Sequence, residues 1–169
     1  GVLDNTIIIY TSDNGGEKVA AEKYPGNNGF FRGAKGGAYE GGCRVPAIFY
    51  YPKAWGHRKT SEPMHCIDFM PTFLDMCNVK NPRKVDGVSM LPTLEKNVPM
   101  PQRKLYSAET GFMTVTDGDW KCVWGKNDKM ELFNLMTDRN EEHDLSAMYP
   151  ERVEGYKKDM QNWWNDCTK

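Results

Sequence analysis

Residues 6–16 read Thr-Ile-Ile-Ile-Tyr-Thr-Ser-Asp-Asn-Gly-Gly, an apolar run that stops on an acid, an amide and two glycines. The run is continuous and rich in β-branched residues. A half-buried strand would instead alternate between apolar and polar residues. This pattern is typical of a central strand in a parallel sheet that is covered on both faces. We therefore predict a buried strand over residues 6–11, followed by a sharp change of direction at the glycines.

The polar residues at the end of this strand are candidates for a metal site. Ligands of open α/β sheets sit beyond the carboxyl ends of the strands, which is where Asp13 and Asn14 fall. A carboxylate and an amide offer hard oxygens, which suit Ca²⁺ or Mg²⁺, but calcium takes six to eight such ligands. The alternative is a simple Asp-Asn-Gly turn with Asn14 in the left-handed conformation. The stretch by itself leaves both interpretations open.

Residues 15–44 are glycine-rich and read as a long, shaped loop, a kind of segment that is usually functional or disordered. Within it, Lys35 offers a compact positive charge for an oxyanion, and Arg32 offers a planar fork. Arg44 offers a second fork, although we favour a structural role in which it pairs with Glu40 and pins the loop. The phosphate-binding pattern G-x-x-x-x-G-K-[ST] is absent.

The pattern of the remaining residues predicts an α/β segment followed by a small antiparallel sheet with one helix. The expected elements are a buried strand at 45–51, a helix after Asp68, a connecting segment at 78–103, a hairpin at 112–124 turning at 117–118, a strand at 131–135 and a closing helix after Pro150. The apolar residues Met70, Phe73, Leu74 and Cys77 define one face of the first helix, with Asp68 as its N-cap.

Composition excludes several functions. A net charge of −1 lacks the basic excess of a nucleic-acid binder, and no apolar run approaches the roughly 20 residues that span a bilayer. The five cysteines form no C-x-x-C pair and no zinc spacing, so we expect no structural zinc. The chain begins with Gly instead of Met, so we expect a processed product, a fragment or a partial chain.

The order of the motifs resembles the C-terminal part of sulfatases, nearest to the arylsulfatase type within the alkaline-phosphatase-like superfamily. Residues 5–16 resemble the family's strand and metal motif, and residues 26–28 with 31–36 and 39–46 resemble its lysine loop. The later motifs are similar in the same order. They are residues 65–72, 86–89, 118–121, 131–135 and 138–145.

The resemblance implies a division of labour. Asp13 and Asn14 would be two ligands of a bound Ca²⁺, and Lys35 would contact the sulfate. In the family a formylglycine hydrate, made from Cys or Ser, attacks the sulfur, while cations neutralise the ester oxygens. The nucleophile pattern C-x-P-S-R follows none of the five cysteines. The resemblance thus implies an N-terminal portion of the same sulfatase as partner, a sulfate ester as substrate, and a chain that is inactive alone.

From the same resemblance we expect residues 1–103 to be the C-terminal part of the catalytic α/β domain and residues 104–169 a small α+β subdomain. A lysosomal, secreted or extracellular location is implied too. Two other interpretations stay open. One is a sulfatase-like protein without catalysis that has a structural or sulfated-ligand-binding role, and the other is an enzyme acting on phosphate esters.

Overall fold

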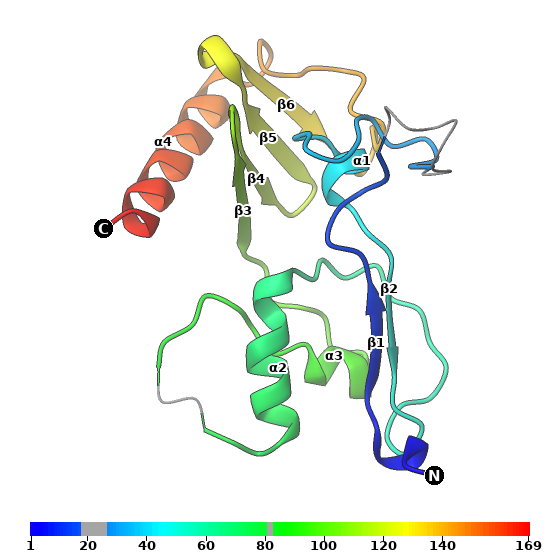
Figure 1. The fold of residues 1–169 in the computed structure, drawn as a ribbon. Coiled ribbons are helices and arrows are strands. Elements are labelled where there is room, and N and C mark those ends of the chain that lie inside the picture. The colour runs from blue at the N-terminus through cyan, green and yellow to red at the C-terminus, as the bar shows by residue number, and fades with distance from the viewer. Residues whose placement is uncertain (18–26, 81–82) are drawn as a thin grey trace. The chain divides into compact units, whose positions relative to one another are not determined.

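A computed structural model describes residues 1–17, 27–80 and 83–169 (Figure 1). The chain forms two compact units. The first contains Gly1–Tyr10 and Ile48–Gln102, and the second contains Thr11–Ala47 and Arg103–Lys169. The predicted domain boundary at residues 103 and 104 stays a prediction. None of the described helices is both long and apolar enough to cross a membrane.

The two predicted apolar strands form and pair with each other. They are β1 (Ile8–Thr11) and β2 (Ala47–Tyr50), and a short 3-10 helix, η1 (Leu3–Asn5), precedes them. The expected burial on both faces is not met, because Ile8 is 44% exposed and Ile48 is 59% exposed. Among the described residues these two strands make a sheet of their own, so no further strand covers their edges or faces.

The helix predicted after Asp68 is also present, but its apolar face is open. It is α2 (Phe69–Met76), preceded by η2 (Cys66–Asp68), and Met70, Phe73 and Cys77 on the predicted inner face are exposed. The buried helix residue is instead Thr72, whose hydroxyl donates to the carbonyl of Asp68 at 2.6 Å. The helix is thus anchored through polar groups, and its apolar face is not covered by the described residues.

Asp68 occupies the N-cap position of α2, as predicted, yet its carboxylate does not cap that helix. It accepts the backbone N–H of His65 at 2.8 Å and that of Val88 at 2.9 Å, and so ties the connecting segment to η2. Within the segment predicted as a plain connection lies a short helix, α3 (Leu91–Lys96). Periodicity over six residues is too short for the sequence to reveal it.

The second unit contains a four-stranded antiparallel sheet in the order β3-β4-β5-β6. The predicted hairpin is confirmed, with Gly118 in the left-handed conformation (φ 58°) at its turn, and the predicted third strand is confirmed as β6. The strand β3 was not predicted. The bounds are β3 Lys104–Glu109, β4 Phe112–Asp117, β5 Trp120–Trp124, the 3-10 helix η3 Lys126–Asp128 and β6 Met130–Asn134.

Both faces of this sheet are covered, which explains why the middle residues of its central strands are buried. On one side the predicted closing helix, α4 (Pro150–Cys167), packs Tyr156 and Met160 against Cys122 (Figure 1). On the other side the glycine-rich loop, with its one-turn helix α1 (Glu40–Cys43), places Ala38 against Val123. The loop therefore rests on the sheet, and this packing positions the residues of the candidate site.

Candidate functional site

The end of β1 turns through Ser12 and Asn14. The Ser12 hydroxyl donates to the Asn14 carbonyl at 2.8 Å, and the Asn14 Nδ2 donates to the Gly15 carbonyl at 3.0 Å. The Asn14 side chain is thereby fixed by its nitrogen, which leaves the Oδ1 oxygen as its ligand atom. The neighbouring Asp13 is exposed.

Gly15 is required by a close approach of two backbones. Its N–H donates to the Gly42 carbonyl at 2.9 Å, and a Cβ at this position would lie 1.8 Å from the Gly41 carbonyl oxygen. No side chain fits there. The first of the two glycines after Asp13-Asn14 thus lets the end of β1 dock directly on α1.

Gly16 joins the same end of β1 to the lysine loop. Its N–H donates to the Asn28 Oδ1 at 2.7 Å, and its carbonyl accepts from the Asn28 Nδ2 at 3.0 Å and from the backbone N–H of Lys35 at 3.1 Å. Asn28 also donates to the Gly33 carbonyl at 3.2 Å. Asn28 belongs to the motif at residues 26–28, but the sequence gives no sign that it connects the two candidate motifs.

The candidate site residues are available for a ligand. Both Asp13 and Lys35 are exposed, and within residues 1–17, 27–80 and 83–169 neither side chain has a hydrogen-bond or ion-pair partner. The structure places the backbone of Lys35 against Gly16, two positions after Asn14. The metal-ligand and sulfate-contact roles of these residues stay predictions.

The two arginines of the loop are used for internal contacts. The predicted pairing of Arg44 with Glu40 is confirmed, with Nη1 and Oε2 3.2 Å apart. Arg32 stacks on the ring of Tyr39, with its guanidinium carbon 3.7 Å from the ring centre, and donates to the Tyr39 hydroxyl at 3.0 Å. That hydroxyl donates to Glu131 at 2.6 Å. Burial, and then this bond to Glu131, raises the pKa of Tyr39 to about 12.

A buried ionic cluster beneath the loop was not foreseen from the sequence. Lys121, at 2% side-chain exposure, lies between Glu40 and Glu141. The signal that could have found it is a lysine in the middle of the apolar strand Trp-Lys-Cys-Val-Trp, since lysine is almost never fully buried unless it is paired.

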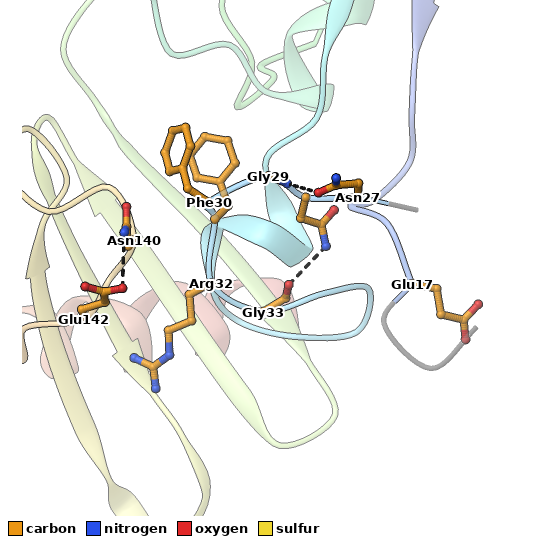
Figure 2. A pocket seen from close by; sticks show the side chains of 10 residues that line it. Glu17, Asn27, Gly29, Phe30, Arg32, Gly33, Asn140 and Glu142 are labelled. Atoms are coloured by element: carbon orange, nitrogen blue, oxygen red, sulfur yellow. Dashed lines mark hydrogen bonds between the residues drawn. The ribbon is translucent and has the colours of Figure 1, made fainter. Parts of the chain in front are cut away.

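A pocket of about 420 Å³ opens beside the loop (Figure 2). Phe30 and Gly33 of the loop line it together with Asn140 and Glu142, which donate and accept one hydrogen bond between them at 3.3 Å. Figure 2 shows Arg32 extending from the loop on the side where Asn140 and Glu142 lie. The pocket lining is therefore mixed, with amide, carboxylate and guanidinium groups next to the aromatic rings of Phe30 and Phe31.

The donor set at the end of β1 fits part of a calcium site. The side chains of Asp13 and Asn14 offer hard oxygens that have no partner among the described residues, but calcium requires six to eight such oxygens. In the described part of the chain, no group of three or more His, Cys, Asp or Glu side chains could hold a metal ion. These residues can therefore contribute to such a site but cannot complete it.

All five cysteines are free thiols, so none of them forms a disulfide within the chain.

Comparison with known proteins places the chain in a family. Residues 1–79 match the family model described as Sulfatase. The chain is 34% identical over 145 residues to N-acetylgalactosamine-6-sulfatase of Mus musculus, a match that covers 82% of this chain and 27% of that protein. It is 34% identical over 160 residues to N-acetylglucosamine-6-O-sulfatase of Bacteroides thetaiotaomicron, covering 86% and 27%. The chain thus spans about a quarter of the length of these relatives.

A solved structure agrees with the sequence matches. The crystal structure of Ps i-CgsB superposes with a TM-score of 0.83 at 29% identity, over 95% of this chain and 37% of that one. The fold is α/β, part of an alkaline-phosphatase-like sheet followed by the small antiparallel sheet with its packed helix. The chain therefore belongs to the sulfatase family and corresponds to a C-terminal portion of a sulfatase.

Proposed function

We propose that this chain is the C-terminal portion of an arylsulfatase-like sulfuric ester hydrolase. In this proposal Asp13 and Asn14 are two ligands of a Ca²⁺ and Lys35 contacts the sulfate group. The N-terminal portion of the same protein carries the formylglycine nucleophile, so the chain alone is inactive. Residues 1–103 would complete the catalytic α/β domain, and residues 104–169 would form its small subdomain. The protein would be lysosomal or secreted, as the family resemblance implies.

One observation carries the proposal. Two motifs that are distant in sequence meet through Gly15 and Gly16, which bond to Gly42, Asn28 and Lys35. These backbone contacts bring the loop that carries Lys35 to the strand end that carries Asp13 and Asn14, and the ammonium and the oxygens of these side chains have no partner within the described residues. Such a combination suits a sulfate ester, because its negative charge is spread over several oxygens and is best met by more than one positive group.

The chain's own residues would have simple tasks in the reaction. Lys35 would hold one sulfate oxygen by a charge-assisted hydrogen bond and stabilise the charge that shifts onto the oxygens as the ester bond breaks. Asp13 and Asn14 would hold the cation, which when bound supplies Lewis-acid stabilisation of the sulfate. The glycines would keep the backbones of both motifs in contact, so that the cation and the ammonium face the same anion.

The exposed apolar surface of the first unit supports the proposal that an N-terminal portion of the protein packs there. Ile8 of β1, Ile48 of β2 and Met70 of α2 are 44%, 59% and 46% exposed, although strands of this composition are usually covered on both faces. An N-terminal portion that packs on the faces of β1 and β2 and on α2 would bury these side chains. We propose it as their occupant.

The experiment is a comparison of two esters with the full-length protein that carries this chain. We expect hydrolysis of an aryl sulfate to exceed that of the matching aryl phosphate, and residues 1–169 alone to hydrolyse neither. Preference for the phosphate would reassign the protein to phosphate esters. Calcium binding without turnover of either ester would support the non-catalytic alternative, a structural or sulfated-ligand-binding protein.

A further inference from the structure

The most unusual side chain of the second unit is Lys121, in the middle of β5. Its ammonium nitrogen lies 2.9 Å from the Glu40 Oε1 and 3.0 Å from the Glu141 Oε1, and its side chain is 2% exposed. Glu141 is fully buried and Glu40 is 8% exposed. Burying three charges costs free energy unless each is paired, so this cluster requires a well-defined geometry.

The strand's alternation explains how a lysine comes to lie there. In β5, Cys122 points to the α4 side of the sheet, where it packs in the first core cluster. Its neighbour Val123 therefore points to the opposite face, where it packs with Ala38 of the loop. Lys121 shares that face, so its ammonium meets the carboxylate of Glu40 at the start of α1. The sheet thus presents a cation to the underside of the glycine-rich loop.

Glu141 holds the same loop at two further points. Its Oε2 accepts the backbone N–H of Glu40 at 2.6 Å, and its backbone carbonyl accepts from the Arg32 Nη1 at 2.7 Å. Glu141 itself has a φ of 57°, a conformation that is uncommon for residues other than glycine and that the surrounding contacts must maintain. Both ends of the segment from Arg32 to Glu40 are therefore tied to this residue.

The two carboxylates favour the charged form of Lys121. Burial lowers the pKa of Lys121, but the carboxylates of Glu40 and Glu141 outweigh this effect and raise it above its ordinary value. Burial raises the pKa of Glu141, and the attraction of Lys121 offsets only part of that rise. The ion pair of Lys121 with Glu40, which Arg44 also contacts, links β5 directly to α1.

The link continues from α1 to the candidate site through backbone hydrogen bonds. The Gly41 N–H donates to the Arg32 carbonyl at 2.7 Å, and the Gly42 carbonyl accepts the N–H of Gly15 at 2.9 Å. The glycines of α1 are closely packed against the loop, because a Cβ on Gly41 would lie 2.5 Å from the Gly33 carbonyl oxygen. A shift of α1 would therefore move both the end of β1 and the loop that carries Lys35.

We propose that Lys121 is a positioning residue for Lys35: by holding Glu40 and Glu141 it fixes α1, and thereby the lysine loop, against the end of β1. The inference rests on the proposed function for its catalytic consequence. Lys121 touches no substrate in this scheme. Its effect reaches the sulfate only through the place that it gives to Lys35.

The test uses the full-length protein, in which Lys121→Met removes the charge and keeps most of the side-chain volume. We expect a fall in kcat/KM of about 10- to 100-fold, the scale of a 1 Å misplacement of a catalytic group. In the Lys35→Ala background the same substitution should cause almost no further fall. The matched control is Lys104→Met, which removes an exposed pair with Asp159 in the same unit and should leave kcat/KM unchanged.

Glu40→Gln serves as a second variant because Lys121→Met leaves two buried carboxylates without a cation. The amide keeps the shape of Glu40 and leaves the Lys121–Glu141 pair balanced, so this variant should fold. Hydrogen exchange of the Lys35 amide, measured by NMR, gives a readout that does not depend on turnover. We expect its exchange to be faster in Glu40→Gln, and unchanged in Lys104→Met.

Three results would overturn the positioning role. They are a fall in kcat/KM of equal size with and without Lys35, an equal fall in the Lys104→Met control, and unchanged exchange of the Lys35 amide in Glu40→Gln. Failure of the proposed function looks different, because then Lys35→Ala itself leaves turnover unchanged. In that event the amide exchange alone decides whether Lys121 and Glu40 hold the loop.

Discussion

The backbone N–H of Lys35 donates a hydrogen bond to the carbonyl oxygen of Gly16 at 3.1 Å, which ties the lysine loop to the end of β1. The Asn28 amide, which bonds to both the N–H and the carbonyl of Gly16, fixes the same junction from the side. The junction is formed by backbone groups and one partly buried side-chain amide, so it does not depend on the charges of Asp13 and Lys35. The side chains of Asp13 and Lys35 can therefore be replaced individually without loss of this junction.

Lys35→Met should lower kcat/KM for an aryl sulfate in the full-length protein by about 10²- to 10³-fold, the usual effect of removing one group that stabilises transition-state charge. The Lys35 side chain is exposed, so its loss should leave the free energy of unfolding almost unchanged. Lys158→Met, an exposed lysine on α4, is the matched control and should retain full activity. Equal activity of the two variants would remove Lys35 from the sulfate site.

Asp13→Ala should lower the calcium content of the full-length protein, measured by elemental analysis after dialysis. A cation bound only to the folded state stabilises it, so a chelator should lower the melting temperature of the unmodified protein and have a smaller effect on the variant. Asp166→Ala, an exposed aspartate at the end of α4, should behave like the unmodified protein. Unchanged calcium content in Asp13→Ala would exclude Asp13 as a ligand.

Gly15→Ala should destabilise the second unit by about 3 kcal/mol, the upper part of the range for overpacking, because the new Cβ would meet the Gly41 carbonyl at 1.8 Å. Denaturant unfolding measures the change. A Cβ at Gly155, on the exposed side of α4, meets no atom within 4 Å, so Gly155→Ala should instead stabilise by about 0.5–1 kcal/mol. Similar effects of the two substitutions would show that Gly15 is not closely packed.

The local elements of this fold were accessible from the sequence because short-range signals determine them. The two-residue turn at Gly118 follows from its conformational freedom, and the closing helix after Pro150 follows from apolar spacing. Pairing of Arg44 with Glu40 was also predictable, since the two residues are four apart. In each case the deciding information lies within one turn or one hairpin.

The contacts that hold the candidate site could not be derived in this way. The loop is contacted by three side chains from strands and turns far along the chain, Lys121, Glu131 and Glu141. The residues next to them in the sequence do not indicate a partner near residue 40. The exposed faces of β1 and α2 differ from expectation for the opposite reason. Their apolar composition predicts burial, but the described residues leave these faces exposed.

Tyr39→Phe should change the response of the protein to alkaline pH. The pKa of Tyr39 is raised from 10.0 to about 12, first by burial and then by its hydrogen bond to Glu131. Between these pH values the unfolded chain loses the phenol proton while the folded chain keeps it. The contribution of the protonated Tyr39 phenol to the free energy of unfolding is therefore complete below pH 10. It is lost as the pH rises towards 12.

Tyr39→Phe should accordingly show a shallower fall in melting temperature over this interval than the unmodified protein does. The difference between the phenolate absorbance titrations of the two proteins isolates Tyr39 and should give a midpoint near pH 12. Glu131→Gln, which removes the negative charge beside the hydroxyl, should move that midpoint towards 10. A difference titration centred on pH 10 in the unmodified protein would show that the bond between Tyr39 and Glu131 does not hold the loop on the sheet in solution.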